Sequence, residues 1–293
     1  MLILEILISG VLLGGLYACM AIGFSIVWGV TNLINLAHGS MIILGAYITW
    51  GLYTHAGIDP FLGLPVAAGA LFAFGYLLQR LLLNRVIQVS LFMTLVLTFG
   101  LDMLLVNLNL EFFSANVRSI TVAYSGLALE FGGIRVPVTR IAVFFMALLL
   151  TWLLHLFMNH TRTGHAIRAT AQNPRAASIL GIDTRQTYAI AFGIGAALAG
   201  AAGSLMAVLY SFSPVTGASL TMKSFVIVLL GGLGSIHGAI VAATVLGVSE
   251  NLVSGLFAPG LRDAVSFFLL LFVLLLRPRG LFGNNYTSDA KIG

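Results

Sequence analysis

The feature that most constrains this chain is a succession of apolar runs, each long enough to cross a lipid bilayer. An α-helix rises 1.5 Å per residue, so about 20 apolar residues span the hydrocarbon core. We predict an all-α polytopic membrane protein that forms a single transmembrane domain over residues 1–293, with about eight spans and one short broken helix. The spans lie near residues 5–28, 36–54, 61–83, 88–110, 138–159, 187–209, 237–257 and 262–277, and the short segment lies at 222–234.

Composition supports this class and excludes others. Hydrophobic residues make up 59% of the chain and charged residues 8%, against about 25% charged residues in an average soluble domain. The first basic residue is Arg80, so the apolar N-terminus lacks the positive segment of a cleaved signal peptide and is expected to remain as the first span. Cys19 is the only cysteine, which argues against a disulfide framework or a cysteine-based metal site. Nucleic-acid binding would need a clustered soluble basic surface, and the net charge of +5 does not form one.

The distribution of basic residues predicts which ends of the spans face the cytoplasm. Nine of the fourteen lysines and arginines fall in three segments: Arg80 with Arg85, the loop at 161–185, and the tail from Arg277. Because short cytoplasmic loops are enriched in basic residues, these segments are placed inside. Three spans precede Arg80, so we expect the N-terminus outside and the C-terminus in the cytoplasm. An even number of crossings must then separate residue 185 from residue 277.

The segment at 222–234 must therefore carry the chain across the membrane, although its apolar part is too short for an ordinary span. We expect a half-helix from Lys223 to Leu230 and then an irregular passage, with Gly232 and Gly234 facing a cavity near the midplane. A similar polar break separates the first two spans, and His-Gly in both breaks suggests an internal repeat. Packing alone is the competing interpretation. The predicted pathway-lining residues are Asn32, Asn35, His38, Gly39, Ser40, Gly231, Gly232, Gly234, Ser235 and His237.

Small residues at four-residue spacing predict close helix contacts. Gly10 and Gly14 lie on one stripe of the first span, and nearly every position from Gly193 to Ser204 is Gly or Ala. In lipid, where no hydrophobic force drives association, such stripes let helix backbones approach each other. The helix at 187–209 is therefore expected to be wedged among several neighbours.

The basic loop at 161–185 is predicted to be a shaped surface. His165–Gln172 is predicted as a short helix, Asn173 can cap a second one, Pro174 suits its first position, and Gly181 suits its end. Two short helices joined by a capped corner favour docking of another protein. A solvated connecting loop is the alternative.

This loop and three other motifs resemble one family. The run Arg175-Ala176-Ala177, followed after three residues by Gly181, resembles the EAA-type cytoplasmic signature of ABC importer permeases, although Arg175 stands where that signature has an acid. IRATAQNPRAASILGI resembles its form in the branched-chain amino acid permeases, the H-type subunit in particular. GLYACMAIGFSIVWGVTNLINLAHGSMIILGAY, GGLGSIHGAIV and RPRGLFG resemble the same family in the same order.

The resemblance implies a permease subunit of an ABC importer in the bacterial inner membrane, moving amino acids, branched-chain ones above all, by ATP-driven alternating access. It implies four partners: a second related permease, two cytoplasmic ATPases and an extracytoplasmic solute-binding protein. The residues that it assigns to ATPase coupling are Arg162, Gly164, Arg168, Pro174, Arg175, Ala176, Ala177 and Gly181.

The outer loop at 111–137 lies on the side where such a binding protein would dock. Its runs VRSITVAYSG and LALEFGGIRVP alternate in part and are separated by Ser125-Gly126, which favours a small hairpin there. A loop that only covers helix ends is the alternative.

Motifs for chemistry are missing. Neither Lys223 nor Lys291 lies in a phosphate-binding loop, and the chain has no H-E-x-x-H or G-x-S-x-G motif, so no catalytic residue, metal or cofactor is predicted. Only two ionisable residues, Asp102 and Glu250, fall clearly within the predicted spans rather than near their ends, and this sparseness weighs against an ion-coupled secondary transporter. A channel for a small solute, and a related permease for urea or short amides, remain alternatives.

Overall fold

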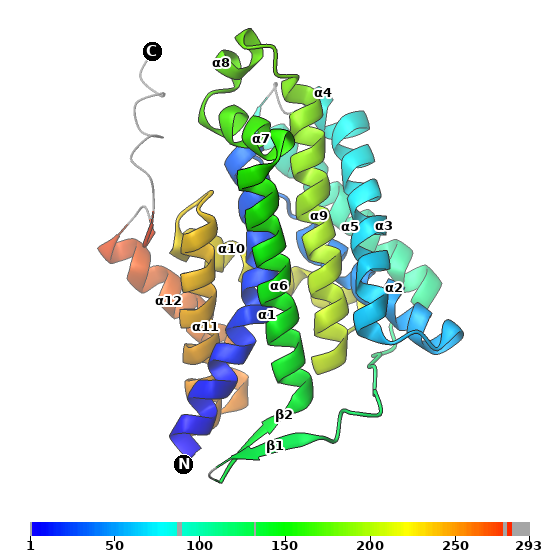
Figure 1. The fold of residues 1–293 in the computed structure, drawn as a ribbon, viewed down its shortest axis with the longest axis vertical. Coiled ribbons are helices and arrows are strands. Elements are labelled where there is room, and N and C mark those ends of the chain that lie inside the picture. The colour runs from blue at the N-terminus through cyan, green and yellow to red at the C-terminus, as the bar shows by residue number, and fades with distance from the viewer. Residues whose placement is uncertain (1, 87–89, 132, 278–279, 283–293) are drawn as a thin grey trace.

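The computed structural model describes residues 2–86, 90–131, 133–277 and 280–282, most of which form a bundle of helices (Figure 1). Within these residues, eight helical segments are long and apolar enough to cross a membrane, which confirms the all-α polytopic class. In chain order, the elements are α1 (Leu2–Thr31), α2 (His38–Ala56), α3 (Pro60–Leu78), the π-helix η1 (Gln79–Leu83), α4 (Asn84–Val86), α5 (Leu91–Phe113), β1 (Ala128–Phe131), β2 (Ile134–Pro137), α6 (Val138–His160), α7 (Arg162–Gln172), α8 (Pro174–Ile179), α9 (Thr184–Leu209), the 3₁₀ turn η2 (Pro214–Thr216), α10 (Gly217–Gly231), α11 (Ile236–Leu256), the 3₁₀ turn η3 (Pro259–Leu261) and α12 (Arg262–Leu276).

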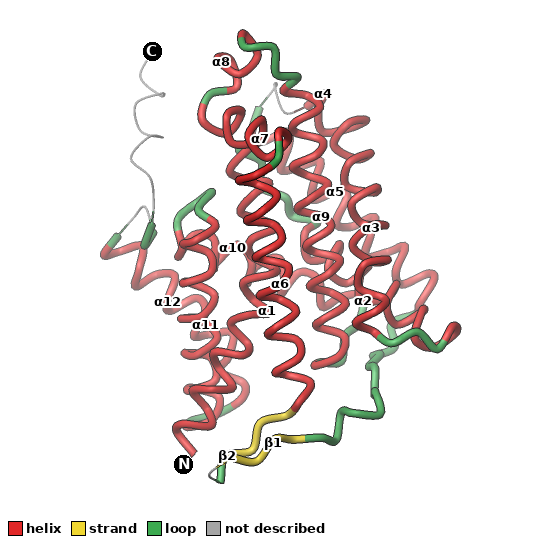
Figure 2. Tube along the Cα trace, in the orientation of Figure 1, coloured by secondary structure: helices red, strands yellow, loops and turns green. Residues whose placement is uncertain are grey.

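The two ends of the bundle carry different segments. The start of α1 lies at the same end as the two strands, which are the only sheet among the described residues (Figure 2). Helices α4, α7 and α8 lie at the opposite end (Figure 1). The basic segments at 80–85 and 161–185 therefore share one end, as predicted, and we call it the α7–α8 end. That this end faces the cytoplasm stays a prediction.

Helices α1 and α9 form the centre, and glycines set their spacing. A Cβ added at Gly23 of α1 would lie 2.8 Å from the carbonyl oxygen of Gly195 in α9, so a larger residue would separate the two helices. On its other faces, α9 meets α3 at Gly200 and α2 at Gly203. This confirms that α9 is wedged among several helices. Along α1, Gly10 and Gly14 lie directly against Val248 and Thr244 of α11.

The spans differ from the predicted set in two places. Pro214–Gly231 is one of the eight membrane-length segments. The prediction of a segment at 222–234 that is too short for an ordinary span was therefore wrong, because the helical segment starts eight residues earlier. α10 begins at Gly217 rather than Lys223, after an irregular passage at residues 210–213. Residues 232–235, which follow α10, are not helical, in agreement with the predicted irregular passage. Conversely, the predicted span at 36–54 corresponds to α2, which is not among the eight because polar residues such as His38 and His55 lower its hydropathy.

The outer loop forms a hairpin, but not at the predicted turn. Leu129 pairs with Val136 and Glu130 with Arg135, so the chain reverses between Phe131 and Ile134 rather than at Ser125-Gly126. The earlier run is held by side chains instead: the Tyr53 hydroxyl donates to the carbonyl oxygen of Thr121 at 2.6 Å. The residues before the hairpin thus form a strap across α2 and α3.

Candidate functional site

The two short helices at the α7–α8 end are built by the caps that the sequence predicted. The Oδ1 atom of Asn173 accepts a hydrogen bond from the Ala176 amide at 3.0 Å, and Pro174 takes the first position of α8. Gly181 ends this segment with a left-handed φ of 84°, a conformation that favours glycine. α7 starts at Arg162, three residues before the predicted start, because the Thr161 hydroxyl accepts from the Gly164 amide at 2.9 Å.

Helix α7 lies against the ends of the central helices. It contacts α1, α6, α8 and α9. A Cβ at Gly164 would collide with the carbonyl oxygen of Phe157 and lie 2.7 Å from the Cα atom of Met158 in α6. Ile167 is fully buried on the same side. A displacement of α7 would therefore press directly on α6 and on the two central helices.

The outward surface of this pair is basic with an apolar tip. Arg162, Arg168 and Arg175 are exposed, and Arg168 donates to the Asn159 side chain at 2.8 Å. Ile179 and Leu180, at the end of α8, are 86% and 81% exposed. Exposed large apolar side chains next to charged ones are typical of a protein contact. The sequence reasoning missed these two residues, although they interrupt a polar loop.

A second candidate site lies inside the bundle, where two half-helices begin. The Nε2 atom of His38 lies 3.0 Å from the carbonyl oxygen of Met20, eleven residues before α1 ends, so residues 32–37 bring the chain back along α1. The Gly39 amide donates to the Thr221 hydroxyl of α10 at 2.8 Å. A Cβ at Gly39 would collide with the carbonyl oxygen of Gly217. The N-termini of α2 and α10 thus meet, and we call residues 35–40 and 217–221 the half-helix junction.

Polar groups line this junction. Asn35, His38 and Ser40 are buried, and the Ser40 hydroxyl donates to Asp102 Oδ1 at 2.5 Å. Asp102, whose role the sequence left open, therefore holds the start of α2 from α5. The Nδ1 atom of His38 and the Ser224 hydroxyl are buried without a partner among the described residues. Asn32, the first of the predicted pathway residues, is exposed.

The second predicted break is not part of the junction. Gly231 ends α10, and Gly232, Gly234 and Ser235 lie in the turn between α10 and α11. The Cα atom of Gly234 lies next to Gly29, near the end of α1. His237 is exposed, with its ring 6.4 Å from that of His155. His38-Gly39 begins α2 and His237-Gly238 lies in the first turn of α11, so the two motifs stand in separate parts of the bundle. The internal repeat and the placement of Gly232 and Gly234 near the midplane stay predictions. Whether this turn lines a pathway stays a prediction.

A buried ionic cluster was also unexpected. Glu250 of α11 is fully buried and accepts from the Tyr17 hydroxyl at 2.6 Å and from the Ser266 hydroxyl at 2.8 Å. The Nζ atom of Lys223 lies 3.0 Å from Glu250 Oε1. Glu250 thus faces Tyr17, which lies halfway along α1. The cluster joins α1, α10, α11 and α12.

The outer strap closes the other end of α2. Arg118 exchanges two backbone hydrogen bonds with Phe212 and lies over the Trp50 ring, 4.7 Å from its centre. The Tyr124 hydroxyl donates to Asp59 Oδ2 at 2.8 Å. Partial burial and this carboxylate raise the pKa of Tyr124 well above its usual value of 10.0, so the hydroxyl keeps its proton.

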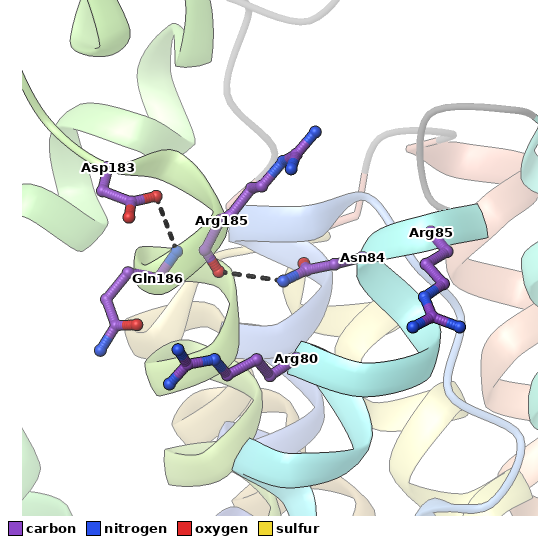
Figure 3. Close-up of a pocket in the computed structure, with 6 residues that line it drawn as sticks. All are labelled: Arg80, Asn84, Arg85, Asp183, Arg185 and Gln186. Atoms are coloured by element: carbon purple, nitrogen blue, oxygen red, sulfur yellow. Dashed lines mark hydrogen bonds between the residues drawn. The ribbon is translucent and has the colours of Figure 1, made fainter.

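A basic pocket lies at the α7–α8 end, beside the start of α9 (Figure 3). Its volume is about 550 Å³. The Asn84 side chain donates to the carbonyl oxygen of Arg185 at 3.3 Å and so joins α4 to α9. Among the described residues, no group of three histidine, cysteine or acidic side chains is placed to hold a metal ion. The pocket is lined by Arg80, Asn84, Arg85, Asp183, Arg185 and Gln186.

Comparison with known proteins gives one consistent result. Residues 6–274 match the family described as branched-chain amino acid transport system / permease component. The high-affinity branched-chain amino acid transport system permease protein BraD of Pseudomonas aeruginosa is 31% identical, and the alignment covers 96% of this chain and 95% of BraD. LivH of Salmonella typhimurium, named in the same way, is 33% identical over the same shares. LivM of Escherichia coli is 29% identical over 91% of this chain and 67% of LivM. No solved structure matches the chain.

Proposed function

Because the chain belongs to the family of branched-chain amino acid transport permease components and is a multi-pass inner-membrane protein, we propose that it carries amino acids, most of all branched-chain ones, into the cytoplasm as one transmembrane subunit of an ATP-driven importer. The observation that carries the proposal is the family match over residues 6–274. The capped helix pair α7–α8, which lies against α1, α6 and α9, supports the ATP-driven part.

Four partner chains follow from this proposal. The two permease names LivH and LivM in the relatives support a second, related permease beside this chain. Of the two cytoplasmic ATPases, one would dock on the α7–α8 surface, with Ile179 and Leu180 as apolar anchors among the arginines, and the other on the second permease. An extracytoplasmic binding protein would deliver the amino acid at the opposite end, near the β1–β2 hairpin.

The mechanism proposed is alternating access. ATP-driven closure of the ATPases moves α7, and the contact at Gly164 passes this motion to α6 and the central helices. The half-helix junction is then the point that opens to one side at a time, since its helix starts are held by single side-chain contacts such as Gly39 to Thr221. Helix N-termini favour negative charge, which suits the carboxylate of an amino acid.

The test is uptake by proteoliposomes that contain the chain, its second permease and the ATPases, with the binding protein outside and ATP inside. We expect labelled leucine to accumulate only with ATP. Unlabelled urea or acetamide should not compete with leucine for uptake. Accumulation without ATP would instead identify a secondary transporter or channel. Competition by urea or acetamide would identify an amide permease of the same class.

A further inference from the structure

The basic pocket beside α9 has a net positive charge, because its arginines outnumber its acidic residues. Arg80, Arg85 and Arg185 line it with one acid, Asp183, whose Oδ1 atom already accepts from the Gln186 amide at 3.0 Å. Within the described part of the chain, none of these three arginines forms a salt bridge. In Figure 3 their side chains come from η1, α4 and α9, lie on different sides of Asn84 and point in different directions. The pocket therefore suits an anion.

An apolar groove lies farther along α3 and α9. It is about 240 Å³ in volume, and its walls come from α3, α6 and α9. No charged side chain contributes to it. It is lined by Ala68, Leu150, Leu153, Leu154, Phe157, Ile194, Ala197, Leu198 and Ala201.

The groove and the pocket lie at different heights along the same two helices, α9 and α3 with its extension η1. On α3, Ala68 lines the groove, and Phe72 and Tyr76 follow at four-residue spacing with stacked rings. Arg80 then donates from its NH1 atom to the Tyr76 hydroxyl at 2.9 Å. On α9, Ile194 lies eight residues beyond Gln186, about 12 Å at 1.5 Å per residue. The groove thus begins within one leaflet's depth of the pocket, about 15 Å.

We propose that the pocket and the groove together bind an anionic phospholipid, with its phosphate among the arginines and one acyl chain in the groove. Guanidinium groups bind phosphate through paired, charge-assisted hydrogen bonds. Tyr76 stands between the two parts, where an aromatic ring with a polar tip is favoured. Leu77, Leu81 and Leu82 are exposed beside Arg80, as expected for a surface that faces lipid. The proposal does not depend on what the protein transports.

The test measures lipid retention by the full chain, purified in mild detergent and delipidated, with native mass spectrometry. Phosphatidylglycerol and phosphatidylcholine with identical acyl chains are added in turn. We expect phosphatidylglycerol to be retained about tenfold more strongly, and the Arg80→Gln/Arg185→Gln variant to lose this preference. Arg135→Gln, on the exposed hairpin at the other end, is the matched control and should keep it.

Two further arms separate the possible occupants. Ala197→Phe fills the groove and should lower retention of both lipids, whereas Arg80→Lys should keep part of the phosphatidylglycerol preference. Phenylglyoxal labelling of Arg80 should be slowed by phosphatidylglycerol but not by inorganic phosphate at equal concentration. Equal retention of the two lipids, unchanged retention in Ala197→Phe, equal protection by free phosphate, or protection by the docked ATPases without lipid would each overturn the proposal.

Discussion

At the scale of single residues, Glu250 shows how one carboxylate joins four helices. Its two oxygens accept from Tyr17 and Ser266 and face the Lys223 ammonium, so the buried charge is satisfied. Glu250→Ala leaves Lys223 unbalanced in the bundle, and we expect a loss of about 3–5 kcal/mol in unfolding free energy. Tyr17→Phe should cost less, about 1.5–3 kcal/mol, because the hydroxyl's bonds to Glu250 and from Lys223 are lost while the two charges still face each other.

The measurement is thermal unfolding of the purified chain in detergent. Glu250→Met combined with Lys223→Met serves as the control, since removing both charges leaves no unpaired ion. It should regain most of the stability that Glu250→Ala loses. Equal stability of Glu250→Ala and the native chain would show that the cluster contributes little.

Two glycines at the α7–α8 end are constrained for different reasons. Gly164 has no room for a side chain against α6, whereas no atom lies within 4 Å of a Cβ at Gly181 and only its φ of 84° is restrictive. Gly164→Val should therefore abolish ATPase recruitment and ATP-dependent uptake. Gly181→Leu, which costs about 1 kcal/mol of backbone strain, should reduce both partly, and Arg175→Ala should affect them least.

Recruitment is measured by co-purification of the ATPases and uptake in proteoliposomes. Gly100→Ala, on α5 with nothing within 4 Å, is the control. Normal recruitment and uptake in both Gly164→Val and Gly181→Leu would mean that α7–α8 is not the coupling surface.

At the scale of elements, local signals were predictable and distant pairings were not. The caps at Asn173 and Gly181 depend only on neighbouring residues, so they could be predicted from the sequence. The meeting of Gly39 with Gly217 joins segments almost 180 residues apart, and glycine carries no side-chain signal for its partner. The two His-Gly motifs lie near the starts of different helices, α2 and α11, and two shared residues carry no information about where those helices pack. The hairpin turn was misplaced because Ser125-Gly126 and the later glycines were equally good turn candidates.

The half-helix junction and the turn at 231–235 should react differently to water-soluble thiol reagents. In a Cys19→Ala background, His237→Cys is exposed in the structure and should react at all times. Thr221→Cys and Ser224→Cys are buried and should react only during ATP-driven turnover, when α2 and α10 separate. Labelling rates with and without ATP and binding protein are the measurement. Constant inertness of 221 and 224 in an active transporter would place the pathway elsewhere.

At the scale of the whole molecule, two groups of helices follow the same order in opposite directions. α1, the return at 32–37, α2 and α3 form one group, and α9, residues 210–216, α10 and α11 form the other. α1 packs against α11 as α9 packs against α3, and the first helices of the groups contact each other at Gly23 and Gly195. Such inverted arrangements place a solute site between the two groups. In this chain that position is the half-helix junction.

A cross-link at this junction tests whether its separation is needed for transport. A Cβ at Gly217 would lie 3.1 Å from the Ser40 hydroxyl oxygen, so Ser40→Cys and Gly217→Cys are close enough to form a disulfide. In the Cys19→Ala background, oxidation of the double variant should stop leucine uptake, since neither half-helix can then move away from the other. Reduction should restore uptake, and the two single variants should be insensitive to the oxidant. Full uptake by the cross-linked protein would mean that the two groups move past the solute without parting at α2 and α10.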